Sequence, residues 1–139
     1  METLERLASL NEPVPQPPDL PSEQDVKNAE ENLGVSFPPS YRRFQLEYSN
    51  ISFGAFEPYL LFEEGSNLDL ISAVKEAREN GLPENLLPFV EDNGDYYCFD
   101  LTTKALEYKV RYWSHNGTTD ENWEDFPDWV EKCWIEEQA

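Results

Sequence analysis

The stretch "LGVSFPPSYRRFQLEYSN", residues 33–50, carries the signals for the end of one helix and the start of the next. Gly34 suits the left-handed conformation in which many helices end, so a helix over residues 23–33 is expected to stop there. Pro38 and Pro39 have the backbone angle that the first turn of a helix requires. The stretch therefore predicts a turn between two helices, the second one starting at the proline pair.

The second helix of this unit has an aromatic stripe. Tyr41, Phe44 and Tyr48 recur at i, i+3 and i+7, which places them on one face. Arg42 and Arg43 fall on other faces. The spacing predicts that the aromatic side chains enter a core, and no residue of the stretch requires a catalytic role.

Upstream, leucines at positions 4, 7 and 10 predict a short amphipathic helix, and five prolines follow within residues 11–21. Proline favours extended, stiff backbone, so residues 1–21 are interpreted as an N-terminal helix and a Pro-rich strap across the surface. A docking peptide for another domain is the alternative. Ser22 and Asp25 form a capping-box pattern that opens the next helix. Residues 22–139 are expected to form one α+β domain.

Downstream, the pattern predicts strands, a helix and an antiparallel meander. Residues 51–63 are aromatic and β-branched and suggest one or two strands, one at a sheet edge because it contains Pro58. A core helix follows, with apolar residues at positions 70, 71, 74 and 77 and an end near Gly81. A strand around residues 87–90 turns back at Asn93-Gly94, the dipeptide typical of a two-residue hairpin.

The last predicted elements are a half-buried strand and a helix. Residues 106–112 alternate, with positions 106, 108, 110 and 112 expected to point inward. The helix carries the apolar residues Phe126, Trp129, Val130, Cys133 and Trp134. The whole order predicts an α+β fold with a mostly antiparallel sheet of about four to six strands and helices packed on one face.

Charge limits the possible partners. The chain has 139 residues, of which 29 are acidic and 10 basic, giving a formal net charge of −19. Nucleic acid and anionic membranes bind Lys/Arg patches, so neither is expected as a partner, whereas a basic protein surface is. Acidity that serves only solubility remains an alternative. The N-terminus lacks a signal peptide pattern, and no apolar run approaches a membrane helix, so a cytoplasmic location is expected.

Candidate chemistry is sparse. His115 is the only histidine, and no nucleophile motif accompanies it. Cys98 and Cys133 match no metal or redox spacing and are interpreted as small buried hydrophobic residues. The segment "DNGD" at residues 92–95 resembles part of a calcium loop, but a hairpin turn explains it better. No cofactor and no metal are predicted, although so many carboxylates leave a glycosidase-like pair open.

The stretch at residues 33–50 resembles the helix–proline–helix signature of the SUKH superfamily, the SMI/KNR family of cell-wall-assembly regulators. The segment "LLPFVEDNGDYYCFDLT" is similar to the second signature of the family, and "VRYWSHN" and "WEDFPDWVE" resemble its last strand and helix. The resemblance covers roughly residues 22–134. Its signature positions are Leu33, Gly34, Pro38, Pro39, Tyr41, Phe44, Leu87, Pro88, Phe89, Gly94, Tyr97, Phe126 and Trp129.

The resemblance implies a non-enzymatic domain, either a bacterial immunity protein that blocks a cognate toxin or a regulatory scaffold. A nuclease-type toxin is expected to be basic, so the acidic excess favours the immunity function. An enzyme with Asp100, Trp113 and His115 in a pocket is the third hypothesis, and the oligomeric state is expected to be a monomer or a weak dimer. The predicted partner-binding residues are Glu63, Glu64, Asp92, Asn93, Asp95, Asp100, Trp113, His115, Asp120 and Glu121.

Overall fold

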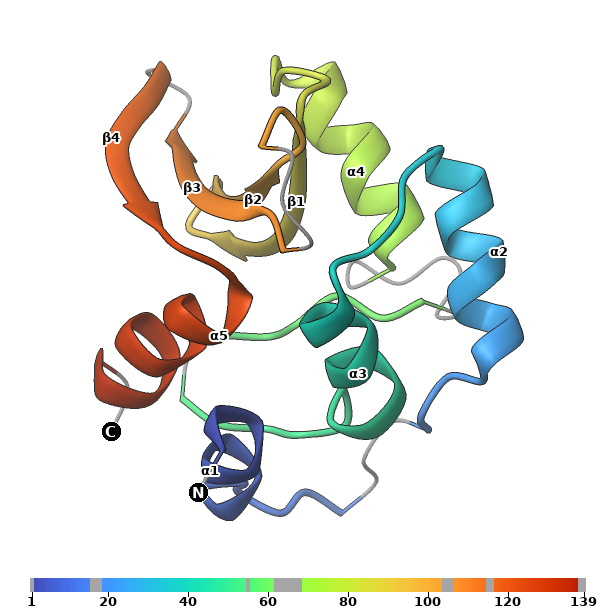
Figure 1. Cartoon of the computed structure of the whole chain (residues 1–139), viewed down its shortest axis with the longest axis vertical. Coiled ribbons are helices and arrows are strands. Elements are labelled where there is room, and N and C mark those ends of the chain that lie inside the picture. Colours follow the sequence, from blue (N-terminus) through green and yellow to red (C-terminus); the bar gives the residue numbers. More distant parts are fainter. Residues whose placement is uncertain are drawn as a thin grey trace.

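The computed structural model describes residues 2–15, 19–54, 56–61, 69–103, 107–114 and 117–137. A four-stranded sheet has helices below it and to its right in the view of Figure 1, and its β4 side is uncovered there. The elements in chain order are α1 (Thr3–Ser9), α2 (Glu23–Leu33), α3 (Pro39–Glu47), α4 (Leu70–Glu79), β1 (Leu86–Asp92), β2 (Asp95–Asp100), β3 (Lys109–Ser114), β4 (Gly117–Trp123), α5 (Phe126–Trp129) and the π-helical segment η1 (Val130–Glu136).

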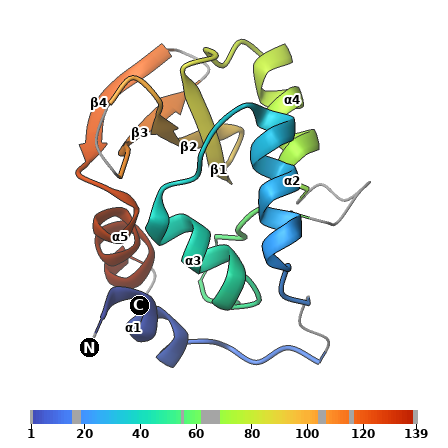
Figure 2. The same ribbon diagram turned by 45° about the vertical axis from the view of Figure 1, so that its right-hand side comes forward.

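The sheet is an antiparallel meander in the order β1-β2-β3-β4. Helices α3 and α5 lie on the same side of it, and α4 runs beside β1 (Figures 1 and 2). The predicted α+β class, the antiparallel sheet of four or more strands and the helices packed against it are confirmed.

The unit around residues 33–50 folds as its residues require. Ser22 and Asp25 form the complete capping box at the start of α2, and Gly34 ends this helix with a φ of 68°. Pro38 is the N-cap of α3 and Pro39 is its first residue. All three predicted boundaries are confirmed, because each depends on a local backbone preference.

The two arginines of this unit hold α3 in place from outside the core. Arg42 forms ion pairs with Glu23 and Glu30 of α2, the latter at 2.5 Å. Arg43 pairs with Glu2, near the N-terminus, and with Glu47 in its own helix. The basic side chains of the stretch are therefore used internally, to fix α3 against α2 and the N-terminal segment.

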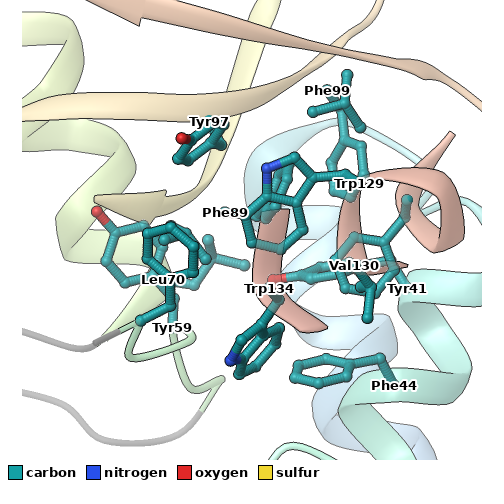
Figure 3. Packing of buried hydrophobic residues seen from close by; sticks show 14 of the residues in the cluster. Tyr41, Phe44, Tyr59, Leu70, Phe89, Tyr97, Phe99, Trp129, Val130 and Trp134 are labelled. Atoms are coloured by element: carbon teal, nitrogen blue, oxygen red, sulfur yellow. The ribbon is translucent and has the colours of Figure 1, made fainter. Parts of the chain in front are cut away.

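The main core is aromatic and lies between the sheet and the helices (Figure 3). Tyr41 is 1% exposed, and the ring centres of Phe99 and Phe126 lie 5.0 and 5.3 Å from its own. Gln45 is fully buried and donates to the Tyr41 hydroxyl and to the carbonyl of Tyr59. The predicted stripe is confirmed for Tyr41 and Phe44, whereas Tyr48 is half-buried.

The N-terminal helix belongs to this core. Leu4 and Leu7 of α1 are buried in the same cluster as Tyr41. Arg6 forms an ion pair with Glu131 of η1, so α1 is fastened to the C-terminal helix. This contact joins the two ends of the described chain.

A smaller cluster covers part of the opposite face of the sheet. Tyr96, Cys98 and Trp113 alternate with the core residues of β2 and β3, and they pack against Ala77 of α4 and Leu82. The opposite face is covered here because α4 lies at the β1 edge of the sheet and contributes residues to both clusters.

The strands expected within residues 51–63 are not formed in residues 51–54 and 56–61. This segment makes only isolated bridges, Phe53 with Phe56 and Leu60 with Asp69. Its aromatic and branched side chains are nevertheless buried. The prediction was wrong because such residues indicate burial, and a core-filling loop satisfies that as well as a strand does.

The hairpin and the following strand match the sequence more closely. Asp92 pairs with Asp95, and Asn93 and Gly94 have φ values of 52° and 90°, as a two-residue hairpin requires. The predicted strand 106–112 is found as Lys109–Ser114, and Leu106 lies outside the described residues. Val110 points into the core as expected, being fully buried.

Candidate protein-binding surface

The β1–β2 hairpin presents carboxylates to solvent. Asp92 and Asp95 face each other across the turn and are half-exposed, and Asn93 at its tip is exposed. The tight turn holds these side chains at one end of the sheet, so three of the predicted partner-binding residues lie together.

Aromatic rings lie beside these carboxylates. The ring centres of Tyr97 and Tyr112 are 4.8 Å apart, and Trp123 of β4 packs edge-on to Tyr97 at 5.6 Å. Tyr97 is buried beneath its two neighbours, whereas Tyr112 and Trp123 are half-exposed. The hydroxyl of Tyr112 donates to Asp95 Oδ2 at 3.0 Å, which ties the rings to the hairpin.

The carboxylates are close enough to change the ionisation of Tyr112. Burial raises the pKa of this tyrosine to about 12, together with the hydrogen bond to Asp95 and the charges of Asp95, Asp92 and Glu121. Burial also raises the pKa of Cys133 to about 12, helped by Glu137 and Glu121. Glu121 therefore acts on Tyr112 together with the hairpin carboxylates.

Five residues define what we call the acidic–aromatic surface: Asp92, Asp95, Tyr112, Glu121 and Trp123. They come from the hairpin, from β3 and from β4. Strand alternation places Tyr97, Tyr112 and Trp123 on the same side of the sheet as Val110 and Phe99. Tyr112 and Trp123 pack against the edge of the core there.

Asp100 and Trp113 are not part of this surface. Trp113 is 7% exposed and belongs to the smaller cluster on the opposite face. Asp100 is 5% exposed and accepts hydrogen bonds from Arg111 Nε at 2.9 Å and from both the amide and the hydroxyl of Thr102. These contacts make Asp100 a structural carboxylate in this arrangement.

The ionisation of Asp100 reflects the same contacts. Burial raises its pKa, but the hydrogen bonds from Thr102 and Arg111 and the charge of Arg111 outweigh this, so the pKa lies below its ordinary value. Hydrogen bonds that favour the ionised form hold this carboxylate in its place in the fold.

Four other predicted site residues lie wholly or partly outside the part of the chain that the structure describes. Glu63, Glu64 and His115 are outside the described residues. The backbone of Asp120 lies in β4, and its side chain is outside the described part. The acidic–aromatic surface therefore unites Asp92, Asp95 and Glu121 from the prediction, and Asn93 lies at the tip of the same hairpin.

Sequence reasoning missed the aromatic half of this surface. Tyr112 was expected to point inward, which is correct for its side of the strand, and Trp123 was not selected. The available signal was the aromatic content of β2, β3 and β4. Alternation shows which face a residue is on, but it does not show where along the strand the helices stop covering that face.

The described residues offer little for catalysis. They contain no group of three His, Cys, Asp or Glu side chains that could hold a metal ion. Cys98 and Cys133 are both buried free thiols, as the sequence predicted, and burial raises the pKa of each. A raised pKa disfavours the reactive thiolate. Among these residues, no helix has both the length and the apolar character needed to cross a membrane.

Helices packed on a four-stranded antiparallel meander define an α+β domain. The family model SUKH_5, described as SMI1-KNR4 cell-wall, matches residues 1–135. The chain belongs to this family, and the match includes α1 and the Pro-rich segment.

A solved structure agrees with this assignment. A protein from Pseudomonas syringae pv. tomato, known by its crystal structure, is 32% identical, with a TM-score of 0.85, and the similarity covers 96% of this chain and 97% of that one. No curated protein matches the chain.

Proposed function

We propose that this chain is a non-enzymatic binding protein of the cytoplasm, an immunity protein that neutralises a basic, nuclease-type toxin through its acidic–aromatic surface. The family supports a protein-binding role in general. The observation that carries the finer proposal is the convergence of Asp92, Asp95 and Glu121 around Tyr112.

The distribution of charge supports this choice. Arg6, Arg42, Arg43, Arg111 and Lys132 each form an ion pair with a carboxylate of the same chain. At least five of the ten basic residues are thus used internally, while the net charge remains −19. An acidic surface attracts a basic partner over long distances and accelerates its association.

The rings add a contact that charge alone lacks. Aromatic residues are enriched at protein interfaces because they bury a large area with few rotatable bonds. Tyr112 and Trp123 are half-exposed beside the carboxylates. A partner that covers them would gain burial as well as charge neutralisation.

The test is co-expression with toxin domains encoded beside the gene, scored by growth and by recovery of the complex. The triple variant Asp92→Asn, Asp95→Asn, Glu121→Gln is expected to weaken binding at least about tenfold, because close interfacial charges contribute more than 1.4 kcal/mol together. The matched control neutralises Glu31, Glu76 and Glu79, which are exposed on α2 and α4. Both triples change the net charge by the same amount.

Three results would count against the proposal: no recovered toxin, equal weakening by both triples, or binding that salt does not alter. Equal weakening would mean that net charge acts without a particular face. Attraction between exposed charges is screened over about 8 Å at physiological salt, so binding through this surface has to fall as salt rises.

A regulatory scaffold is the second candidate, and the Pro-rich segment favours it. Val14 and Leu20 are 41% and 42% exposed, unusual values for large apolar side chains in this molecule. Val14 borders a hollow of about 160 Å³ formed with Ile51, Phe56 and Leu60. Deleting residues 13–21 would abolish partner recovery in a pull-down if this segment docks, and unchanged recovery would remove the scaffold candidate.

A further inference from the structure

A hollow lies between helices α2 and α4, which run side by side (Figures 1 and 2). Its volume is about 510 Å³, and its apolar lining consists of Leu33 at the end of α2 and Ile71 and Val74 of α4. This size is within the range of ligand-binding clefts. None of the residues that line the hollow belongs to the acidic–aromatic surface.

The floor of the hollow rests on the main core. Val74 is 2% exposed, whereas Leu33 and Ile71 are half-buried and pack against the core from outside. Positions 71, 74, 75 and 78 are spaced i, i+3, i+4 and i+7, so they share one face of α4. This face therefore supplies both the apolar floor and two basic residues, Lys75 and Arg78.

These two cations form no ion pair with any carboxylate in the described part of the chain. Lys75 is exposed and stays unpaired although Glu79, which also lines the hollow, lies four residues further along the helix. Arg78 donates through Nη2 to the carbonyl of Glu84 at 3.2 Å, and its Nε is buried with no hydrogen-bond partner among the described residues. A guanidinium has five N–H donors, so Arg78 retains donors that the chain does not use.

The helix dipole explains only part of this arrangement. The negative end of the dipole favours a cation in the last turn of α4, which accounts for Arg78. Lys75 comes three residues earlier, and the dipole does not account for its position over an apolar hollow. Five other basic residues of the chain pair with carboxylates of the chain. The hollow is therefore locally basic in a chain whose net charge is −19.

We infer that this hollow binds an acidic amphipathic helix of a partner protein. The apolar side chains of that helix lie on Leu33, Ile71 and Val74, and its carboxylates reach Lys75 and Arg78. Grooves lined by apolar residues commonly accept a helix with anchors at i, i+3, i+4 and i+7. The inference goes beyond the proposed function, because it concerns a second surface and a partner of opposite charge, and it does not rest on the toxin.

The first experiment compares two designed peptides by isothermal titration calorimetry on the full chain, at about 0.15 M salt. Both are amphipathic helices of about 18 residues with the same leucine stripe, flanked by glutamate in one and by glutamine in the other. The glutamate peptide is expected to bind at least about threefold more tightly, because only its carboxylates pair with the two cations. The net charge of the chain would repel this peptide and produce the opposite order. Equal affinities, tighter binding of the glutamine peptide, or binding of neither would overturn the inference.

The second experiment assigns the preference to the cations. Lys75→Gln is expected to lower the glutamate-to-glutamine affinity ratio, and adding Arg78→Gln is expected to bring it to one or below. Lys132→Gln is the matched control, since it removes the same charge from η1, on the other side of the molecule from α2 and α4 (Figures 1 and 2). This control is expected to keep the ratio. A ratio that Lys132→Gln lowers as much as Lys75→Gln does would contradict a site in the hollow.

A third variant tests the apolar floor. Ile71→Ser is expected to weaken both peptides at least about fivefold and to keep their ratio, because it removes apolar surface that both peptides cover. Unchanged affinities in this variant would rule out the hollow as the binding site. Arg78→Gln removes the donor to the Glu84 carbonyl, so its folding is checked by thermal denaturation. If it does not fold, Lys75→Gln supplies the measurement, since this side chain is exposed.

The outcomes separate this inference from the proposed function. The triple variant of Asp92, Asp95 and Glu121 is expected to keep the preference for the glutamate peptide, and Lys75→Gln is expected to keep toxin recovery. A chain that recovers no toxin but prefers the glutamate peptide through Lys75 would remove the proposed function and support the inference. Toxin binding without that preference would do the reverse.

Discussion

The two ends of the sheet carry similar residues in different surroundings. At one end, Phe99 and Val110 are fully buried under the helices, and Asp100 is bound by Arg111 and Thr102. At the other end, Tyr112 is half-exposed and Asp95 lies at a solvent-facing hairpin. At each end an aromatic residue lies near a carboxylate: Phe99 precedes Asp100 in β2, and the Tyr112 hydroxyl donates to Asp95.

The helices account for this difference. Tyr41 of α3 and Phe126 of α5 pack on Phe99, with ring centres at 5.0 and 5.9 Å. These rings bury the Phe99 end of the sheet face, called the closed end below, whereas Tyr112 at the hairpin end, called the open end, stays half-exposed. The same strand pattern thus serves folding at one end and, in our proposal, recognition at the other.

The largest expected effect on stability comes from removing a buried ring that covers the closed end of the sheet. Tyr41→Ala removes a buried ring that packs against Phe37, Phe44, Phe89, Phe99 and Phe126. We expect the free energy of unfolding to fall by about 3–5 kcal/mol, measured by chemical denaturation, because the helix layer loses its central contact and leaves a cavity.

Tyr41→Phe is the matched control for this change. It keeps the ring and removes only the hydroxyl that accepts a hydrogen bond from Gln45, so a loss of about 1 kcal/mol is expected. A similar loss from both variants would contradict the importance of the ring packing at this end.

The boundaries of α2 and α3 were predictable because they are encoded locally. Gly34, the proline pair and the capping box each set the backbone without help from distant residues. The segment after α3 was not predictable in the same way. Phe53 and Phe56 are buried without forming a regular strand, since the core requires their side chains and provides no neighbouring strand for their backbone.

A substitution of Asp100 measures how much its charge contributes to stability at the closed end of the sheet. Asp100→Asn removes the charge that accepts a hydrogen bond from Arg111, and we expect a loss of about 1–3 kcal/mol at neutral pH. The folded pKa of Asp100 lies below its ordinary value of 3.8, so this contribution is present above that pH and is lost as the pH falls through the folded pKa. Unfolding measured across acidic pH should therefore show the two proteins converging.

A stability difference between wild type and Asp100→Asn that stays constant down to the lowest pH would contradict this account. It would mean that the asparagine disturbs packing rather than charge. Asp95→Asn at the open end is the comparison variant, because its carboxylate lies at a half-exposed position.

The hairpin at the open end allows a smaller, local test. Gly94 has a φ of 90° and nothing lies within 4 Å of the position where a Cβ would be added, so Gly94→Ala costs only backbone strain. We expect a loss of about 1 kcal/mol in unfolding experiments. Asn93→Gly, at a φ of 52°, is the control and is expected to be nearly neutral, because glycine adopts this conformation freely.

The candidate site was only partly predictable, for a reason that concerns long-range structure. The hairpin residues followed from the Asn-Gly turn, and acidic residues in turns are readily selected as solvent-facing. Trp123 requires knowing that β4 pairs with β3, which brings this residue opposite Val110 and its ring against Tyr97. Asp100 was selected as a position that matches the family signature, although Arg111, eleven residues away, donates a hydrogen bond to its carboxylate.

The smallest expected effect on stability is at the open end. Asp92→Asn with Glu121→Gln should change the free energy of unfolding by less than about 0.5 kcal/mol, since exposed charges away from the core contribute little to folding. Any change is expected to be a gain, because the two side chains lie in one negative field around Tyr112. Thermal denaturation at low and high salt measures it, and the gain should shrink as salt rises. A loss above about 1 kcal/mol would show that these carboxylates stabilise the fold, as Asp100 does, and the contrast between the two ends of the sheet would then disappear.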